Sequence, residues 1–480
     1  MSFKNFVNTK LFKNSSFGIV SSIIQNVFVS IFFVVIARKY SKDEFANYIV
    51  ANTIYSFLMG FSALGLGHWF IREMINKNFK DDFLNKFFKM QFIIGILFYI
   101  VSIIMTFLIY NNPLIRSLSI LMSINIIFDN LIYVIKNLNI AEQNQKKTFV
   151  LTIIESFLKC LLACCLFFYL IPIFYLALIL LFLRFLTLNL FIKYGSSNKL
   201  NLFAIFRIKI SYQEIFKIIS SNWSFVIMGT LSIVYWRMGN LIVSKYLTNN
   251  DIANYEVSFK LLSLAFILPT IVSTSIYPML LKALNESFDE MKKLYSKIFI
   301  PYSSYGILAY SFVCSFSDIF IPFLFGNKFG DTSVYCREMF LIILIFPTFL
   351  LQAELLISMK LEKLDMICNI VSIVINLLLI LIGLNFFKSL SVINYSIFLS
   401  IFIFHFVQDV ILIRKKVANY LHVFMFYISI FTIIAVYKWG VILIDKHYLF
   451  VIILLIFIFY FIFYFKKKNT IPLDGNMINK

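Results

Sequence analysis

The sequence predicts an all-α membrane protein that crosses the bilayer about 14 times. Hydrophobic residues make up 61% of its 480 residues and charged residues only 14%, which is more apolar surface than one soluble core could bury. The mean hydropathy is +0.89. The apolar residues are also gathered into runs of about 20, the length at which a helix crosses the hydrocarbon core of a bilayer.

Each run of this length is interpreted as one crossing. Many runs contain Asn, Ser, Thr and Tyr, which suit helix faces that contact other helices or a cavity. The last run is almost wholly Ile, Leu, Phe and Tyr, so we expect a peripheral helix exposed to lipid. The predicted helices lie near residues 15–37, 47–71, 88–110, 114–137, 149–170, 173–194, 215–240, 254–281, 298–323, 335–359, 366–386, 391–413, 421–443 and 448–465.

The distribution of Lys and Arg predicts the orientation. With the N-terminus inside, the cytoplasmic segments carry 29 of the 43 Lys and Arg residues and the opposite segments carry 9. Cytoplasmic loops of membrane proteins have this excess, so both termini are expected in the cytoplasm. The net charge of +20 then suits the anionic cytoplasmic leaflet. Nucleic acid is not an expected partner, because no basic face lies away from the membrane.

Two pairs of similar segments indicate an internal repeat. KYSKDEFANYIVANTIYSFL, from Lys39, and KYLTNNDIANYEVSFKLLSL, from Lys245, share Lys-Tyr and Ala-Asn-Tyr. NLNIAEQNQKK, after the fourth helix, is more weakly similar to LISMKLEKLD, after the tenth. Both pairs have similar offsets and preserve orientation, although chance similarity is the alternative. We therefore expect two parallel six-helix bundles, 1–212 and 213–420, and an extra helix pair with a basic tail, 421–480.

Catalytic chemistry has no obvious place in the sequence. No segment between the predicted helices is long enough for a soluble catalytic domain, and there is no Walker-type glycine loop or metal-ligand spacing. The six cysteines lie in or beside apolar runs without a CxxC motif, which favours buried packing. We expect a protein that is not an enzyme and has no catalytic residues, metal or cofactor.

Cations within the predicted helices are the main functional candidates. A cation in the hydrocarbon costs about 2.5–3.5 kcal/mol on insertion scales, so it usually faces a wet interior, a partner or a substrate. Arg237, Lys260 and Arg184 are predicted to line a cavity. For Arg237 and Lys260 the alternative is snorkelling to the surface, since both lie near helix ends. No acid stands one turn from Arg237 on its own helix.

Lys159 differs because Glu155 precedes it by four residues, the favourable order for an ion pair on one helix. A structural pair and a substrate site are both consistent with this spacing. Three other acids also lie inside predicted helices, namely Asp129, Glu354 and Asp409. Together with Glu155, they could neutralise the cations or take up protons in a coupled cycle.

Three stretches of the sequence carry a family pattern. They are VYWRMGNLIVSKYLTNNDIANYEVSFKL, from Val234 to Leu261, and the stretches Ala37–Met74 and Pro322–Asp365. They resemble the polysaccharide flippases of the MATE/MOP superfamily, namely the Wzx-type O-antigen flippases and their lipid II flippase relatives. In the first stretch, the residues that match the family pattern are Tyr235, Trp236, Arg237, Tyr255 and Lys260. Gly239 and Ala253 stand where the family often has Asp and Gly, so a charge-pairing role of that Asp is absent here.

This resemblance implies a flippase for polyprenyl-pyrophosphate-linked oligosaccharide in the bacterial inner membrane, with a cavity between two bundles. Its partners would be the lipid-linked substrate of undecaprenyl-pyrophosphate type, membrane lipids and other polysaccharide-assembly proteins. A lipid II flippase is the nearest alternative. A multidrug exporter would need interior acids in place of the cations, and a membrane glycan polymerase or ligase would usually show a large periplasmic loop.

Overall fold

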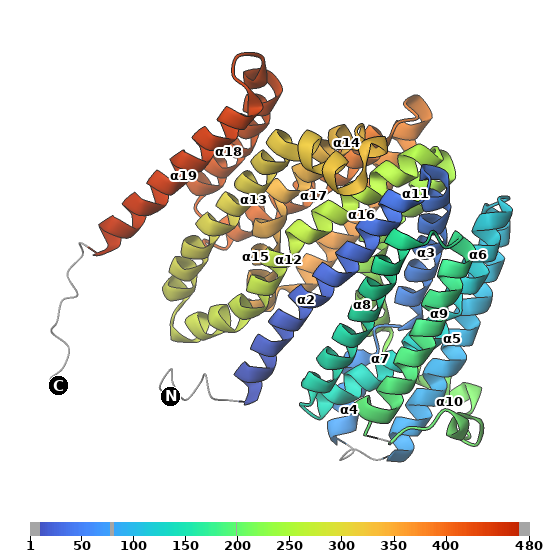
Figure 1. Cartoon of the computed structure of the whole chain (residues 1–480). Helices are drawn as coiled ribbons and strands as arrows, with labels where there is room; N and C mark the ends of the chain where they lie inside the picture. The colour runs from blue at the N-terminus through green and yellow to red at the C-terminus, as the bar shows by residue number, and fades with distance from the viewer. Residues whose placement is uncertain (1–9, 77–80, 198, 470–480) are drawn as a thin grey trace, which may run out of the picture. The chain divides into compact units, whose positions relative to one another are not determined.

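The computed structural model describes residues 10–76, 81–197 and 199–469, and every regular element in these ranges is helical (Figure 1). In this part of the chain, 12 helical segments are long and apolar enough to cross a membrane. α11 (Trp223–Tyr246) and α19 (Lys446–Asn469) are two further helices of 24 residues each, so the count is close to the expected 14. The predicted all-α, multi-pass fold is confirmed.

The chain forms two compact units. Unit 1 comprises Met1–Ser258, Phe323–Thr332 and Ile373–Ser396, and unit 2 comprises Phe259–Pro322, Ser333–Ser372 and Ile397–Lys480. The expected division into 1–212, 213–420 and 421–480, with a parallel repeat, remains a prediction.

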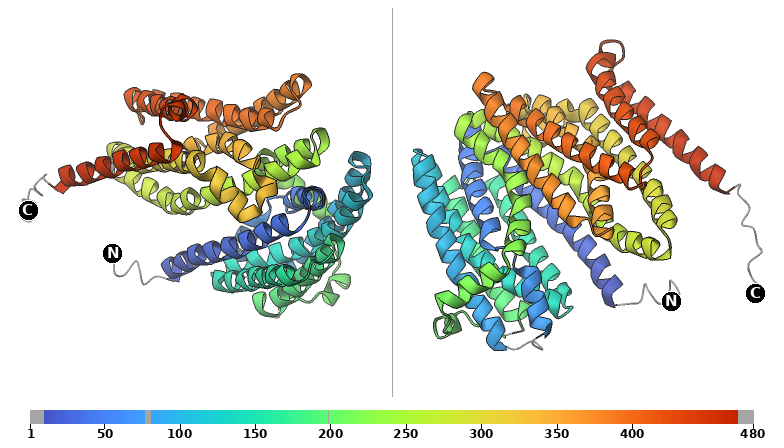
Figure 2. Two further views of the ribbon diagram at one scale, coloured as in Figure 1. Left: turned by 45° about the horizontal axis from the view of Figure 1, so that its top comes forward. Right: turned by 180° about the vertical axis from the view of Figure 1, so that it is seen from behind.

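Helices in unit 1 pack in pairs. α2 (Lys10–Lys39) lies along α8 (Gln145–Phe168) in both views of Figure 2, and α11 packs on α3 (Lys42–Ser62). The remaining elements of this unit up to residue 246 are α4 (Gly67–Asn76), α5 (Asp81–Ile109), α6 (Pro113–Ser123), α7 (Asn125–Ala141), α9 (Ile173–Leu190) with a π-helical turn at Phe191–Gly195, a 3-10 turn at Phe203–Phe206, and α10 (Tyr212–Ser221).

Some predicted crossings are interrupted. The 47–71 run divides into α3 and α4 because Leu64 and Gly65 have φ of 50° and 58°, a left-handed conformation that cannot continue a right-handed helix. The 215–240 run divides at Asn222, whose φ of −122° ends α10 before α11 begins. The start of this predicted crossing is therefore wrong, and its first residues form a separate short helix.

α12 (Asn249–Glu286) and α13 (Phe288–Phe325) are 38 residues each. They are longer than the predicted crossings because the polar connection between those crossings is itself helical. Within unit 2 the two helices are joined by Tyr302, whose hydroxyl donates to the Pro269 carbonyl at 3.2 Å. The following elements are α14 (Thr332–Met339), a 3-10 turn at Phe340–Leu344, α15 (Phe346–Ser358), α16 (Glu362–Phe386), α17 (Leu390–Arg414), α18 (Tyr420–Trp439) and a 3-10 turn at Gly440–Ile442.

The predicted 335–359 crossing consists of α14, a 3-10 turn and α15. Gly306 of α13 lies directly against this turn, since a Cβ atom at position 306 would be 2.6 Å from the Ile343 carbonyl oxygen. Glycine is needed there because two backbones approach within the space of a side chain.

Candidate functional site

A buried ion-pair network joins α3, α7, α8 and α9 of unit 1. Its members, called the arginine cluster, are Tyr55, Asp129, Glu155, Lys159 and Arg184. The Arg184 guanidinium contacts both acids: Nε lies 2.5 Å from Asp129 Oδ1, and Nη1 lies 2.5 Å from Glu155 Oε2. Tyr55 donates its hydroxyl hydrogen to the other oxygen of Asp129.

Lys159 completes the arginine cluster from the same helix as Glu155. Its Nζ lies 2.7 Å from Glu155 Oε1. The side chains of Asp129 and Glu155 are 1% and 8% exposed, whereas that of Lys159 is 28% exposed. Glu155 therefore bridges two cations, one inside the unit and one closer to its surface.

Lys136 of α7 is a further cation, which was expected in a cytoplasmic segment. It lies within electrostatic reach of Arg184, Glu155 and Asp129, and its Nζ is 5.8 Å from the centre of the Phe191 ring. Lys136 could have been recognised from the sequence as a cation within a crossing, because it lies just before the end of the predicted 114–137 helix. With Lys136 included, three cations surround two acids.

A second buried polar network lies in unit 2 and contains Thr348, Gln352, His405, Asp409 and Tyr427, called the histidine cluster. Tyr427 donates to Asp409 Oδ2 at 2.7 Å, and Gln352 donates to Asp409 Oδ1 at 2.6 Å. The two His405 ring nitrogens lie 2.9 Å from Thr348 Oγ1 and 2.8 Å from the Tyr427 hydroxyl oxygen. α15, α17 and α18 are thus joined by one set of hydrogen bonds.

Asp409 is 1% exposed and its side chain lies 3.1 Å from His405 Nδ1. Among the described residues, the ion pairs give it no Lys or Arg partner. The contacts of this carboxylate are therefore made by imidazole, hydroxyl and amide groups.

Arg237 and Lys260 belong to different helices and different units. Tyr255 of α12 lies within electrostatic reach of two charged side chains, Arg237 of α11 and its own neighbour Glu256. Glu256 is 7% exposed and accepts a hydrogen bond from Asn240 of α11. This buried carboxylate comes from the neighbouring helix, so a search of Arg237's own helix for acids missed it. Lys260 is half-buried.

Glu354, the remaining acid among the candidates, lies apart from these clusters. Its Oε1 accepts a hydrogen bond from Ser273 of α12 at 3.0 Å. Asp365, near the start of α16, accepts a hydrogen bond at 2.7 Å from Gln408, the residue before Asp409. Four of the residues predicted from the sequence thus lie together in the arginine cluster, namely Asp129, Glu155, Lys159 and Arg184. The other predicted residues lie at separate positions.

The helix beginnings that follow the repeated Lys-Tyr motif meet in unit 1. α3 and α12 each begin with a reciprocal cap, between Ser41 and Glu44 and between Thr248 and Asp251. Across the two caps, Lys42 Nζ donates to Asn250 Oδ1 at 2.5 Å and Asn249 Nδ2 donates to Asp43 Oδ1 at 2.9 Å. The two similar segments therefore contact each other in a reciprocal arrangement.

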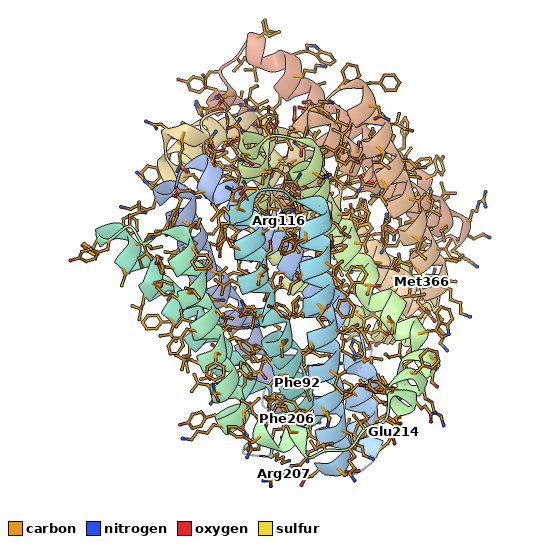
Figure 3. All side chains as sticks on the ribbon, turned by 90° about the vertical axis from the view of Figure 1, so that its right-hand side faces the viewer. Phe92, Arg116, Phe206, Arg207, Glu214 and Met366 are labelled. Atoms are coloured by element: carbon orange, nitrogen blue, oxygen red, sulfur yellow. The ribbon has the colours of Figure 1, made fainter. Side chains whose placement is uncertain are left out.

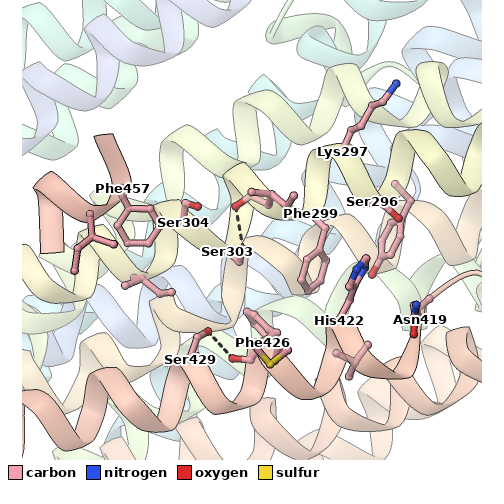
Figure 4. A pocket seen from close by; sticks show the side chains of 17 residues that line it. Ser296, Lys297, Phe299, Ser303, Ser304, Asn419, His422, Phe426, Ser429 and Phe457 are labelled. Atoms are coloured by element: carbon pink, nitrogen blue, oxygen red, sulfur yellow. Dashed lines mark hydrogen bonds between the residues drawn. The ribbon is translucent and has the colours of Figure 1, made fainter. Parts of the chain in front are cut away.

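A groove of about 600 Å³ lies between α13, α18 and α19 in unit 2. Figure 4 shows Phe299, Phe426 and Phe457 along it, with Asn419 and His422 together at one end. The groove is thus mainly apolar with polar groups at an end. It was not predicted from the sequence, where the last helix was interpreted as peripheral and lipid-exposed, because it forms only when this helix pair packs on α13, about 100 residues earlier in the chain.

Comparisons with known proteins agree with this architecture. The sequence matches the family described as polysaccharide biosynthesis protein over residues 35–334, more than half of the chain. No curated protein matches it significantly.

Several solved transporters share the fold. An inward-facing multidrug resistance MATE family transporter of the MOP superfamily has 11% identity and a TM-score of 0.67, covering 82% of this chain and 94% of that one. The MATE multidrug transporter DinF-BH has 13% identity and a TM-score of 0.59, covering 85% and 96%.

A MOP superfamily transporter from Pyrococcus furiosus, described as having a binding pocket of reverse polarity, has 11% identity and a TM-score of 0.58, covering 85% of this chain and 95% of that one. Identities this low establish the fold alone. Together with the family match, they show that this chain is a multi-pass membrane protein of the polysaccharide biosynthesis protein family, built on the MATE/MOP fold.

Proposed function

We propose that this chain is a flippase, and not an enzyme, for polyprenyl-pyrophosphate-linked oligosaccharide, an O-antigen or surface polysaccharide repeat unit. It moves the substrate to the periplasmic leaflet of a bacterial inner membrane by alternating access, with both termini in the cytoplasm. The observation that carries the proposal is a group of three partly exposed cations, Lys136, Lys159 and Arg184, around the two buried acids of the arginine cluster, in a member of a polysaccharide biosynthesis family. A pyrophosphate that crosses a membrane needs cations where water is scarce.

Arg237 and Lys260 are proposed to bind the pyrophosphate as well. The planar Arg237 guanidinium can contact two phosphate oxygens at once, whereas Lys260 offers a compact point charge. Glu256 and Tyr255 lie on the side of α12 that faces α11, where they can orient the guanidinium. Replacement of Arg237 by Lys would preserve the charge and lose the paired geometry.

The groove between α13, α18 and α19 suits the lipid portion of such a substrate. An isoprenoid chain is apolar and flexible, and lipid tails are as apolar as such a surface, so the chain can pass from the bilayer into the groove at little cost. The phenylalanine-lined groove offers this surface, while Asn419 and His422 offer hydrogen bonds near its end.

Alternating access requires contacts that close one end and break in the other state. The reciprocal contacts of Lys42 with Asn250 and of Asp43 with Asn249 are suited to this role. They are polar and exposed, so water can replace them at little cost when the two helix ends separate.

A coupled cycle requires a group that changes its charge. Of the four acids, Asp409 is best suited to carry a proton, since its partners are His405, Tyr427 and Gln352. Asp129 and Glu155 instead contact the guanidinium of Arg184.

The proposal is tested by expressing the chain in two strains, one lacking its O-antigen flippase and the other lacking its lipid II flippase. Restored surface glycan in the first strain, without restored viability of the second, is expected. Rescue of the second strain alone would identify a lipid II flippase. Rescue of neither, with the chain present in the membrane, would count against both assignments.

Arg237 variants sharpen this test. Arg237→Ala is expected to lose nearly all glycan export, Arg237→Lys to retain part of it and Arg237→Glu to retain none, because the pyrophosphate is an anion. Surface glycan is measured at matched membrane abundance. Wild-type export by Arg237→Glu would remove Arg237 from the substrate site.

A further inference from the structure

The segment that connects α9 with α11, residues 199–222, has two apolar faces. Its inner face packs on the helices of unit 1: Leu200 and Ile205 are buried, and Ile215 and Ile218 lie against the same core of unit 1. The segment is also fastened to α5, where Lys89 donates a hydrogen bond to the Ile208 carbonyl. This face accounts for the folding of the segment onto the unit.

The outer face carries separate aromatic side chains, called the aromatic row. Tyr212 and Phe216 are 85% and 73% exposed, and their spacing of four residues places them on one side of α10. Trp223, which begins α11 directly after α10 ends, is 63% exposed. Phe203 and Phe206, which precede α10, are 82% and 75% exposed. These five large aromatic side chains within 21 residues are therefore mostly exposed, although the Phe206 ring also contacts the Phe92 ring of α5.

The same segment is basic. Lys199, Arg207, Lys209 and Lys217 stand against a single acid, Glu214. Figure 3 shows Phe206, Arg207 and Glu214 together at one end of unit 1, with Arg116 at the opposite end. Since the flanking helices α9 and α11 both have membrane-crossing length, the aromatic row lies at the level where the bilayer surface begins.

We propose that residues 199–223 bind the surface of an anionic bilayer, with the aromatic row inserted among lipid headgroups and the basic side chains against lipid phosphates. Tyr and Trp are favoured at this depth because one end of each ring is apolar and the other polar. Lys and Arg beside such a row are attracted to anionic lipid. A protein partner would not by itself explain the excess of positive charge in this segment, nor the location of the segment between two helices of membrane-crossing length.

Spin labelling tests the proposal without any transport substrate. In a variant whose six cysteines are replaced by alanine, a nitroxide is attached at Phe216→Cys or at the matched control Gln213→Cys, and the full chain is placed in phosphatidylcholine–phosphatidylglycerol nanodiscs. Gln213 is exposed but lies about 60° around the helix from Phe216, toward the polar side that bears Glu214 and Lys217. Collisions with lipid-soluble oxygen and with a water-soluble nickel chelate are compared.

The label at position 216 is expected to meet oxygen several-fold more often relative to nickel than the label at 213. This ratio should fall when phosphatidylglycerol is omitted or when Arg207, Lys209 and Lys217 are all changed to Gln. Equal nickel access at 216 and 213 would overturn the proposal, as would protection of position 216 from both reagents, which would indicate a protein surface. Thermal unfolding of each labelled variant confirms that it is folded.

Discussion

The arginine cluster and the histidine cluster are both buried among membrane-crossing helices, but they balance charge in different ways. In the arginine cluster, Asp129 and Glu155 contact the permanent charge of Arg184. In the histidine cluster, Asp409 contacts His405, Tyr427 and Gln352. The acids of the first cluster thus contact a permanent cation, whereas Asp409 contacts imidazole, hydroxyl and amide groups.

This difference suits two separate tasks in the proposed transport cycle. A cluster built on a permanent cation can fix the arrangement of α7, α8 and α9 and maintain a positive field for an anionic substrate. A carboxylate whose contacts are imidazole, hydroxyl and amide groups suits the proposed proton carrier. We therefore propose the first task for the arginine cluster and the second for Asp409.

The largest effect is expected from Arg184→Ala. Removal of this guanidinium leaves Asp129 and Glu155 buried without their shared cation, and breaking a buried ion pair from one side costs about 3–5 kcal/mol. The folded protein should be lost or its thermal unfolding temperature strongly lowered in detergent. Arg184→Lys is the matched control, because it keeps the charge and should recover part of the stability.

If Arg184→Ala unfolds at the wild-type temperature, water must solvate the two acids and the arginine cluster is not a fixed element. The contrast between the clusters would then disappear.

An intermediate effect on stability is expected from Asp409→Asn. The amide retains hydrogen-bonding groups for Gln352 and Tyr427, so the free energy of unfolding should change by only about 1 kcal/mol. Glycan export should nevertheless fall strongly, because the amide cannot serve as the proposed proton carrier. Export is measured as surface glycan at matched membrane abundance. Wild-type export by Asp409→Asn would remove Asp409 as the proposed proton carrier.

The smallest effect is expected from Lys159→Met. The Lys159 side chain is 28% exposed, and in this variant Glu155 keeps its contact with Arg184 at 2.5 Å. The free energy of unfolding should therefore fall by only about 0–1 kcal/mol. Parallel unfolding curves for this variant and Arg184→Ala give the comparison. A loss as large as that of Arg184→Ala would make Lys159 an equal structural member of the arginine cluster.

Much of the helical framework follows from the sequence, since each crossing is a local run of apolar residues. The contact of Glu155 with Lys159 follows in the same way from a spacing of four on one helix. The α3–α4 break was not predictable from hydropathy, because the left-handed conformation at Leu64 interrupts a run that stays apolar throughout. The short helix α10 was missed because its apolar residues extend the α11 run.

Which residues form the two clusters depends on packing between helices. It could not be predicted from the apolar run of each helix considered alone. Arg184 meets acids from α7 and α8, and Tyr427 reaches Asp409 from a helix that was predicted to lie outside the two bundles. Glu256 was overlooked because the search around Arg237 was confined to one helix. Pairwise contacts of this kind require tertiary structure, whereas crossings require only length and hydropathy.

Proteoliposomes allow the proposed movement of a lipid-linked diphosphate sugar to be measured without other cell components. A fluorescent polyprenyl-diphosphate oligosaccharide is placed in one leaflet, and a membrane-impermeant quencher reports its appearance in the other. We expect movement by the wild-type chain, none by Arg237→Glu, and none of a phospholipid bearing the same fluorophore. If the diphosphate sugar moves no faster than in protein-free liposomes, with the chain folded and inserted, the chain is not a flippase for this substrate.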